Sequence, residues 1–568
     1  MPAPSRTSNH PDYDRASTSR WVVLLLGVLM VGTPLASATP TSLSARDAQN
    51  KRFTEQLMGK PNHHSPTPTA QYNHVITYGQ SLASAAEGWP ALSKHPRYDN
   101  LMLGGSTRSA TYSGTRFTPV GESAFRPLKA VVQLKRDAKT ILGSAAIAAL
   151  DPQAQEEGES VEVGALNMAR RLYLDTHGLE SDPEHLFVAS NAATSGRSIA
   201  QLAKAGGTNE YRRVLQAVDQ AKQLADAEGA SYSLSAFFWL QGEYDYTEVQ
   251  GGINDKAIYK KMLRQLRDDL NTDTAKAIGQ TRMPAFISYQ TDAKSSVVDG
   301  SLDIGMAQWE LAQEEPNWYL AGPVYPYVDK GTHLSANGYR WFGQMLGKVY
   351  HHVVVERRHW IPLSPHRATV NGREILIDFH VPAPPLTFGQ PYLGYEARPI
   401  KNRGFTLSDA QGEVAIEAVD IAADTVVRLI AGRDLVGTPR IRYASHAVDG
   451  AGELRDSDPT QADAHYEYLP DEGMSPDANI AALVNKPYPL NNWSIAFEID
   501  ASEHAPHATS TALTNAATTP VSGDAAQACQ ILDRRSAKQS AVLAAELRGA
   551  LVPDAIPRRR DFQPFGHQ

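Results

Sequence analysis

The sequence of 568 residues contains one cysteine, Cys529. A single thiol excludes an internal disulfide framework, a cysteine-rich zinc site and an iron–sulfur cluster. The sequence also lacks an excess of positive charge, because 54 Lys and Arg residues stand against 62 Asp and Glu residues, a net charge of −8. This balance gives no reason to expect nucleic acid or anionic lipid as a partner. The length predicts two to four domains, held together by core burial rather than by disulfides.

Long hydrophobic runs are scarce as well. The longest, Trp21–Val31, has 11 residues, whereas a membrane-spanning helix needs about 20. Arg15 and Arg20 precede this run and Ala36-Ser37-Ala38 follows it. That order is typical of a cleavable secretory signal over residues 1–38, with an uncut membrane anchor as the alternative. We therefore expect a secreted or periplasmic protein that has no membrane span after cleavage behind Ala38.

The next part of the chain predicts an α/β domain. Residues 39–71 are polar and punctuated by proline, which indicates a linker or an N-terminal arm. From 72 to 356, amphipathic stretches of helical spacing (161–174, 211–225 and 257–270) alternate with short apolar runs. The runs predict buried strands at Val75–Tyr78, Leu186–Ser190, Leu234–Leu240, Ala285–Tyr289 and Trp318–Ala321. Such alternation predicts a parallel sheet with helices on both faces.

The pattern changes after residue 357, where β-type sequence and turn residues dominate. Ala368–His380 reads as a hairpin around Asn371-Gly372, a strong short-range hairpin signal. Residues 357–502 therefore predict an antiparallel β-sandwich that serves as an accessory domain. Residues 503–568 are rich in Ala, Thr and Ser and predict a low-complexity, disordered tail with room for one helix at 536–551.

Three polar segments stand where a parallel sheet places its ligands, just past the carboxyl ends of strands. The first is Tyr78–Ala83, in which Ser81 lies on a turn from strand to helix. The second is Trp239–Asp245, which places Gln241, Glu243 and Asp245 together at the edge of the sheet. The third is Asp329–Ser335, which contains His333. Taken singly, each has an ordinary structural explanation: a turn with a serine cap, a polar loop, and a structural histidine before a helix cap.

Taken together, the three segments supply the parts of nucleophilic acyl transfer. A hydroxyl needs a base to take its proton, the base needs an orienting carboxylate, and the oxyanion needs hydrogen-bond donors. The chain order is Ser81, Asp329, His333. The G-x-S-x-G elbow of another hydrolase class is absent.

Gly79-Gln80-Ser81, Gln241-Gly242-Glu243-x-Asp245 and the loop ending in His333-Leu334 resemble the motifs of the SGNH (GDSL-like) hydrolases. The most similar branch is that of sialate O-acetylesterases and carbohydrate acetylesterases, whose first motif reads G-Q-S. The resemblance covers about residues 72–352. It implies a flavodoxin-like three-layer α/β/α domain and hydrolysis of small esters, typically acetyl groups on sugars, without metal or other cofactor.

The resemblance also implies roles for single residues. Ser81 matches the nucleophile and His333 the base. Gly104 or Gly105 and the Gln241 amide match oxyanion or substrate-binding groups, and Glu243 matches a residue that orients its neighbours. Asn191 and Arg197 follow another strand and are candidates to line the pocket. Arg197 could equally be a structural ion-pair partner.

One departure concerns the orienting acid. The family spaces its acid and histidine as D-x-x-H, but here Lys330 stands three residues before His333 and Asp329 stands four before it. Either the loop bulges by one residue, or His333 depends on a backbone carbonyl or on another acid such as Glu243.

Two other functions stay open at this point. Glu243 and Asp245 are two residues apart and could serve as the paired carboxylates of a glycosidase. The irregularity at Lys330 would also suit a catalytically silent envelope or carbohydrate-binding protein on an esterase scaffold. An acylated carbohydrate or small ester is the substrate or ligand that the sequence favours.

Overall fold

The computed structural model describes residues 42–247, 251–296 and 301–503. The predicted signal segment 1–38 and nearly all of the predicted tail, with Cys529, lie outside the described residues. Among the helices of the described part, none combines the length and the apolar character needed to cross a bilayer.

Within the described residues, seven strands form the main sheet in the order β3-β2-β4-β1-β5-β6-β7. All neighbouring strands are parallel except β3, which runs antiparallel to β2. The strands are β1 (Tyr72–Gly79), β2 (Leu101–Leu103), β3 (Phe125–Pro127), β4 (Leu186–Asn191), β5 (Tyr232–Leu240), β6 (Ala285–Gln290) and β7 (Trp318–Pro323). Each of the five predicted strands is present. The short β2 and β3 were not predicted.

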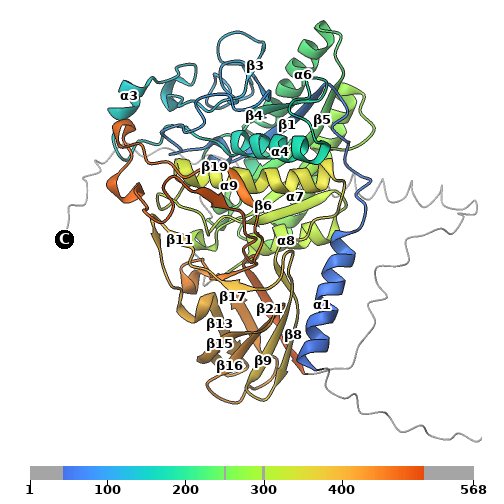
Figure 1. Ribbon diagram of the computed structural model, residues 1–568, viewed down its shortest axis with the longest axis vertical. Coiled ribbons are helices and arrows are strands. Elements are labelled where there is room, and N and C mark those ends of the chain that lie inside the picture. Colours follow the sequence, from blue (N-terminus) through green and yellow to red (C-terminus); the bar gives the residue numbers. More distant parts are fainter. Residues whose placement is uncertain (1–41, 248–250, 297–300, 504–568) are drawn as a thin grey trace, which may run out of the picture. The chain divides into compact units, whose positions relative to one another are not determined.

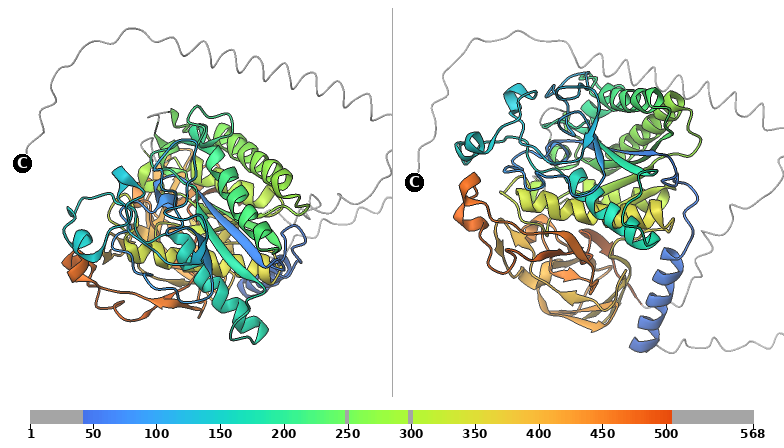
Figure 2. Two further views of the ribbon diagram at one scale, coloured as in Figure 1. Left: turned by 90° about the horizontal axis from the view of Figure 1, so that it is seen from above. Right: turned by 45° about the horizontal axis from the view of Figure 1, so that its top comes forward.

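Helices cover both faces of this sheet, as the predicted α/β fold requires (Figures 1 and 2). Alternate residues of a strand enter different cores: Val75 packs with the helices of one face and Ile76 with those of the other. Burial on both faces explains why these strands read as continuous apolar runs. On the face of Val75 lie α4 (Val161–His177) and α9 (Ala336–Tyr350), and on the face of Ile76 lie α5 (Ile199–Leu202), α6 (Tyr211–Ala227), α7 (Lys256–Ile278) and α8 (Asp303–Glu314).

The strand order places the candidate segments side by side. Because β1 pairs with β4 on one side and β5 on the other, the carboxyl ends of these three strands meet at one edge. The chain turns from β1 into α2 (Ser81–Ser84) at Gly79, whose φ is +148°. A Cβ at this position would lie 2.0 Å from the Leu240 carbonyl oxygen, so only glycine lets β1 end this close to β5.

The predicted antiparallel β-sandwich follows. One sheet has the order β15-β16-β9-β8-β22 and the other β14-β13-β17-β21. Their neighbouring strands are antiparallel except for β22, which runs parallel to β8. Their inner faces meet through contacts such as Phe379 with Phe497, whose ring centroids are 5.9 Å apart. The predicted hairpin forms from β8 and β9, with Gly372 and Arg373 in the turn, one residue later than predicted. The strands are β8 (Ser364–Asn371), β9 (Glu374–His380), β13 (Phe405–Asp409), β14 (Gly412–Val414), β15 (Ile416–Ala423), β16 (Val426–Ala431), β17 (Arg440–Tyr443), β21 (Phe497–Asp500) and β22 (Ser502–Glu503).

Shorter elements complete the described chain. A segment of the C-terminal region returns to the α/β domain, where Tyr488 stacks on Trp341 of α9 with ring centroids 5.4 Å apart. The short elements are α3 (Ser144–Ala148), β10 (Thr387–Phe388), β11 (Tyr392–Leu393), β12 (Glu396–Ala397), β18 (Leu454–Arg455), β19 (Gln461–His465) and β20 (Pro487–Pro489).

A helix that the sequence did not predict occupies part of the expected linker. α1 (Leu43–Met58) lies beside β8 and β9 (Figure 1). Its buried residues are Arg46, Asn50 and Thr54, so its packed side is polar. Arg46 pairs with the buried Asp378 of β9 at 2.5 Å, and Asn50 donates to the same carboxylate. Residues 43–58 are therefore attached to the β-sandwich by hydrogen bonds.

Candidate active site

Ser81 lies at the first position of α2, directly after the turn that ends β1. Its side chain is partly exposed and its hydroxyl makes no hydrogen bond within the described residues. The N–H groups in the first turn of a helix have no acceptor inside the helix, and the Ser81 N–H has none elsewhere in the described chain. The turn therefore presents a hydroxyl and an N–H donor together.

His333 lines the same cavity as Ser81. This cavity has a volume of about 580 Å³, and its other walls include Gln80, Glu243 and Gly196. All three segments that the sequence analysis singled out therefore line one cavity, to which the first contributes Ser81 and the third His333. The Gly196 N–H has no acceptor in the described part of the chain, which makes it a second candidate donor at this wall.

The two ring nitrogens of His333 differ in their surroundings. Nδ1 is buried and has no hydrogen-bond partner, and it faces the Glu87 carboxylate at 3.5 Å. Nε2 makes no hydrogen bond within the described residues, and the side chain lines the cavity of Ser81. One nitrogen thus faces an acid, and the other is not engaged by any of the described residues, as a general base requires.

Glu87 is a residue that the sequence analysis did not single out. It follows α2 in an irregular turn and adopts a left-handed backbone conformation, with φ +62°. Neighbouring hydrogen bonds hold this turn, because Ala86 donates its N–H to the Ser81 carbonyl at 3.1 Å and its own carbonyl accepts the Tyr339 hydroxyl at 2.9 Å. No spacing rule points to such a residue. The one available signal was Lys330, which occupies the place of the expected acid.

The structure does not place Asp329 beside the His333 ring, where the sequence analysis expected it. Its carboxylate accepts the Gly331 N–H at 2.6 Å, and burial raises its pKa while the nearby Lys294 ammonium lowers it. Among the described residues, Glu87 is the acid whose carboxylate lies within 4.0 Å of a His333 nitrogen. Asp329 lines a different pocket, together with Lys294, and is therefore not the acid that faces His333.

Glu243 joins the first and second segments. It accepts a hydrogen bond from the Gln80 amide at 2.9 Å and one from the Tyr289 hydroxyl. The side-chain amide oxygen of Gln80 in turn accepts the N–H groups of Gly242 and Tyr244, at 3.3 and 3.2 Å. Burial raises the pKa of Glu243. Glu243 and Gln80 thus connect the turn of Ser81 to the end of β5 by hydrogen bonds.

Gln241 and Asp245 face away from the cavity. The Gln241 amide donates to Asp245 and its carbonyl oxygens accept the Tyr259 hydroxyl. Asp245 also accepts the N–H groups of Ile199 and Ile253, at 2.8 and 3.0 Å, and burial raises its pKa to about 6. Both side chains are fully buried. Gln241 is thus held away from the position of an oxyanion donor, and Asp245 is too enclosed to form a glycosidase pair with Glu243.

The glycine N–H groups expected in the oxyanion hole are already occupied. Gly104 donates its N–H to the Ala124 carbonyl at 2.9 Å, and Gly105 donates to Val120 at 2.8 Å. Neither glycine lines the cavity of Ser81. Both N–H groups hold the loop after β2 instead.

Asn191 and Arg197 support the cavity without lining it. The Asn191 amide donates to the Ala83 carbonyl at 2.7 Å and to Glu162. It therefore fixes the position of α2 by a hydrogen bond. Arg197 forms an ion pair with the buried Glu210 at 2.7 Å. This contact corresponds to the structural alternative for Arg197.

Comparison with protein-family models and with curated proteins gives no match. Solved structures that the chain resembles include a carbohydrate acetylesterase from Xanthomonas citri, at 14% identity and TM-score 0.43, over 75% of this chain and 80% of the other. A protein from Arabidopsis thaliana has 12% identity and TM-score 0.33, over 50% and 98%. An aryl esterase from M. smegmatis has 7% identity and TM-score 0.25, over 50% and 98%. At these values the chemistry of this chain has to be argued from its own residues.

Proposed function

We propose that this protein is a serine esterase that removes acyl groups, chiefly acetyl, from carbohydrates. The observation that carries the proposal is the meeting of Ser81 and His333 at one cavity, with Nδ1 of His333 turned toward Glu87. A hydroxyl, an imidazole and a carboxylate in this order are the components of a hydrolytic triad. Glu87 takes the place that sequence analysis gave to Asp329.

The reaction would run in two halves. Nε2 of His333 takes the proton of the Ser81 hydroxyl as Oγ attacks the ester carbonyl carbon, and the oxyanion accepts hydrogen bonds from the N–H groups of Ser81 and Gly196. The protonated His333 then gives its proton to the departing alcohol, which leaves an acyl-serine. A water molecule, deprotonated by the same nitrogen, releases the acid and restores Ser81.

Ser81 and His333 do not form a hydrogen bond with each other in this structure. Neither the Ser81 hydroxyl nor the His333 ring makes a hydrogen bond within the described residues, and Nδ1 lies 3.5 Å from Glu87. Catalytic hydrogen bonds are often long before substrate binds. The proposal therefore requires the Ser81 and His333 side chains, which line one cavity, to come into hydrogen-bond contact when substrate binds.

The test measures hydrolysis of p-nitrophenyl esters with acyl groups of increasing length by the wild type, Ser81→Ala and His333→Ala. We expect Ser81→Ala and His333→Ala to lose activity to a similar extent, because the nucleophile and its base act as one unit. Labelling of Ser81 by an activated organophosphonate is the second readout. Hydrolysis that survives Ser81→Ala would disprove the mechanism, and a wild type inert toward esters and phosphonate would favour a binding protein on the same scaffold.

Export belongs to the same proposal and depends on Trp21–Val31 and Ala36-Ser37-Ala38, outside the described residues. We propose that the chain is secreted or periplasmic and begins after residue 38 when mature. N-terminal sequencing of the protein recovered from the medium or periplasm tests this. A protein that keeps its first residues and stays with the membrane fraction would show an uncut anchor.

A further inference from the structure

The proposed triad takes its acid and its base from two different loops. Glu87 follows the nucleophile turn and His333 lies in the loop before α9, and the carboxylate and Nδ1 are 3.5 Å apart without a hydrogen bond. An acid on the same loop as its base is kept close by the backbone between them. An acid on another loop needs a contact that joins the two loops, because a displacement of about 1 Å in a catalytic group can cost about a hundredfold in rate.

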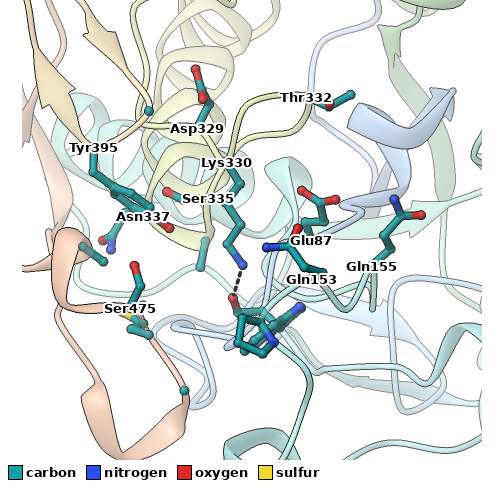
Figure 3. Close-up of a pocket in the computed structure, with 17 residues that line it drawn as sticks. Glu87, Gln153, Gln155, Asp329, Lys330, Thr332, Ser335, Asn337, Tyr395 and Ser475 are labelled. Atoms are coloured by element: carbon teal, nitrogen blue, oxygen red, sulfur yellow. Dashed lines mark hydrogen bonds between the residues drawn. The ribbon is translucent and has the colours of Figure 1, made fainter. Parts of the chain in front are cut away.

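Lys330 makes such a contact. Its Nζ donates to the carbonyl oxygen of Trp89, two residues after Glu87 in the chain, at 3.3 Å and lies 4.3 Å from the centroid of the Trp89 ring. Figure 3 shows this hydrogen bond as a dashed line. The backbone N–H of Lys330 donates to the His333 carbonyl at 2.7 Å. One residue therefore joins the loop of the base to the segment of the acid.

The Trp89 end of this contact has its own hydrogen bonds. Trp89 is buried, and its Nε1 donates to the Ala154 carbonyl at 2.7 Å. Gly88, between Glu87 and Trp89, donates its N–H to the Ala85 carbonyl at 3.1 Å. A loop that binds Trp89 thus takes a defined position relative to Glu87.

The position of Nζ also leaves the Glu87 carboxylate available to His333. Among the described residues, no carboxylate lies within 4.0 Å of Nζ, so Lys330 does not withdraw Glu87 into a close ion pair. Burial lowers the pKa of Lys330 to about 8, and the charge of Glu87 opposes this change. The other titratable side chains that line the pocket of Lys330 are Asp329 and Tyr395, and Asp329 points away from Lys330 (Figure 3).

We propose that Lys330 is a positioning residue, which holds the loop of His333 at the distance from Glu87 that the triad requires. It acts through these two residues. Where the related motif has the acid itself, this chain has the residue that binds the segment of the acid. This inference rests on the proposed function and adds to it the group that keeps acid and base together.

The experiment measures kcat and KM for p-nitrophenyl acetate in the wild type, Lys330→Met and Lys330→Arg. We expect Lys330→Met to lower kcat by about ten- to hundredfold and to change KM by less than about twofold, because the substrate site itself is kept. Lys330→Arg should stay within about fivefold of the wild type, since a guanidinium can also donate to the carbonyl and lie over the ring.

Lys294→Met is the matched control. Lys294 also donates to a backbone carbonyl of the His333 loop, that of Gly331, at 3.1 Å. It lines another pocket, to which Glu87 does not contribute. Its loss removes an anchor of the same loop without touching the segment of the acid, and kcat should stay within about twofold of the wild type.

Two further measurements separate positioning from a general structural role. In the first, kcat/KM of the wild type should fall as the pH rises through about 8, where Lys330 loses its proton. Lys330→Met should lack this decline, and Lys330→Arg should lack it below about pH 10, because a guanidinium stays protonated there. In the second, the double variant Glu87→Gln/Lys330→Met should be within about twofold of Glu87→Gln, because Lys330 acts through Glu87.

An unchanged kcat in Lys330→Met, an equal loss in Lys294→Met, or losses that multiply in the double variant would overturn the inference while hydrolysis still depends on Ser81. If Lys330→Met does not fold, the wild type and Lys330→Arg decide, since the same decline above pH 8 in both would refute the role of Lys330. Hydrolysis that survives Ser81→Ala, or a wild type inert toward ester and phosphonate, would instead overturn the proposed function and this inference with it.

Discussion

Removing the charge of Glu87 is the most direct test of the triad that the structure suggests. At 3.5 Å from Nδ1 of His333, and with an effective dielectric constant of about 20, Coulomb's law gives about 5 kcal/mol between a carboxylate and an imidazolium. Water in the open cavity weakens this attraction. Half of this energy, about 2.4 kcal/mol, corresponds to a loss of about sixtyfold in kcat/KM for Glu87→Gln.

The assay is hydrolysis of p-nitrophenyl acetate by Glu87→Gln and by Asp329→Asn as the matched control. Asp329→Asn removes the acid that sequence spacing favoured, and we expect it to stay within about threefold of the wild type. Formate added to Glu87→Ala should restore part of the activity, because a small carboxylate can occupy the space that the side chain leaves. The reasoning is refuted if Glu87→Gln stays within threefold of the wild type or if Asp329→Asn has the larger loss.

Three predictions concern stability. Arg46→Met removes one ion-pair partner of the buried Asp378 carboxylate, which keeps Arg367 and the Asn50 amide, and should lower the free energy of unfolding in urea by about 1.5–3 kcal/mol. Gly79→Ala places a methyl group 2.0 Å from the Leu240 carbonyl oxygen and should cost at least about 2 kcal/mol in the same assay, together with most of the esterase activity. Burial raises the pKa of Asp292 to about 7, so the folded state binds an extra proton between about pH 4 and 7 and loses stability as the pH rises through that window. Asp292→Asn should therefore gain stability relative to the wild type between pH 5 and pH 8, by at most about 1.4 kcal/mol per pH unit of the window.

Control variants test the first two predictions, and the pH dependence of stability tests the third. Lys51→Met removes a partly exposed ion pair of the same helix and should cost under about 1 kcal/mol. Gly207→Ala adds a methyl group in open space and should leave activity unchanged. If Arg46→Met costs no more than Lys51→Met, the polar attachment of α1 contributes little. A stability difference of Asp292→Asn that is constant with pH would contradict the raised pKa.

The strands of the α/β domain could be predicted because a parallel sheet that is buried on both faces needs continuous apolar runs. The same rule explains the elements that were missed. β2 and β3 have three residues each, too few for a periodic pattern. α1 turns Arg46, Asn50 and Thr54 inward, so a search for apolar helical periodicity reads its packed side as solvent-exposed.

In the candidate site, too, some features could be predicted from the sequence and others could not. Ser81 and His333 could be found because a nucleophile turn and a histidine before a helix cap leave local marks in the sequence. Gln241 and the glycines 104 and 105 carry the matching motifs, but their amide or N–H groups already have partners inside the protein. Motif spacing identifies the loops that reach the sheet edge, whereas the direction of each donor depends on contacts between segments far apart in the sequence.

Lys330 occupies the position at which the orienting acid is missing. In the motif that the sequence resembles, the position three residues before the histidine holds that acid, and here it holds a lysine whose Nζ lies 4.3 Å from the centroid of the Trp89 ring. If Glu87 orients His333 instead, nucleophile and acid share the segment 79–88, which the contacts of Gly79 and Ala86 hold in place. The acid would then have moved from the loop of the base to the loop of the nucleophile, and the order of the three groups along the chain would change while all three still meet at the edge of the sheet.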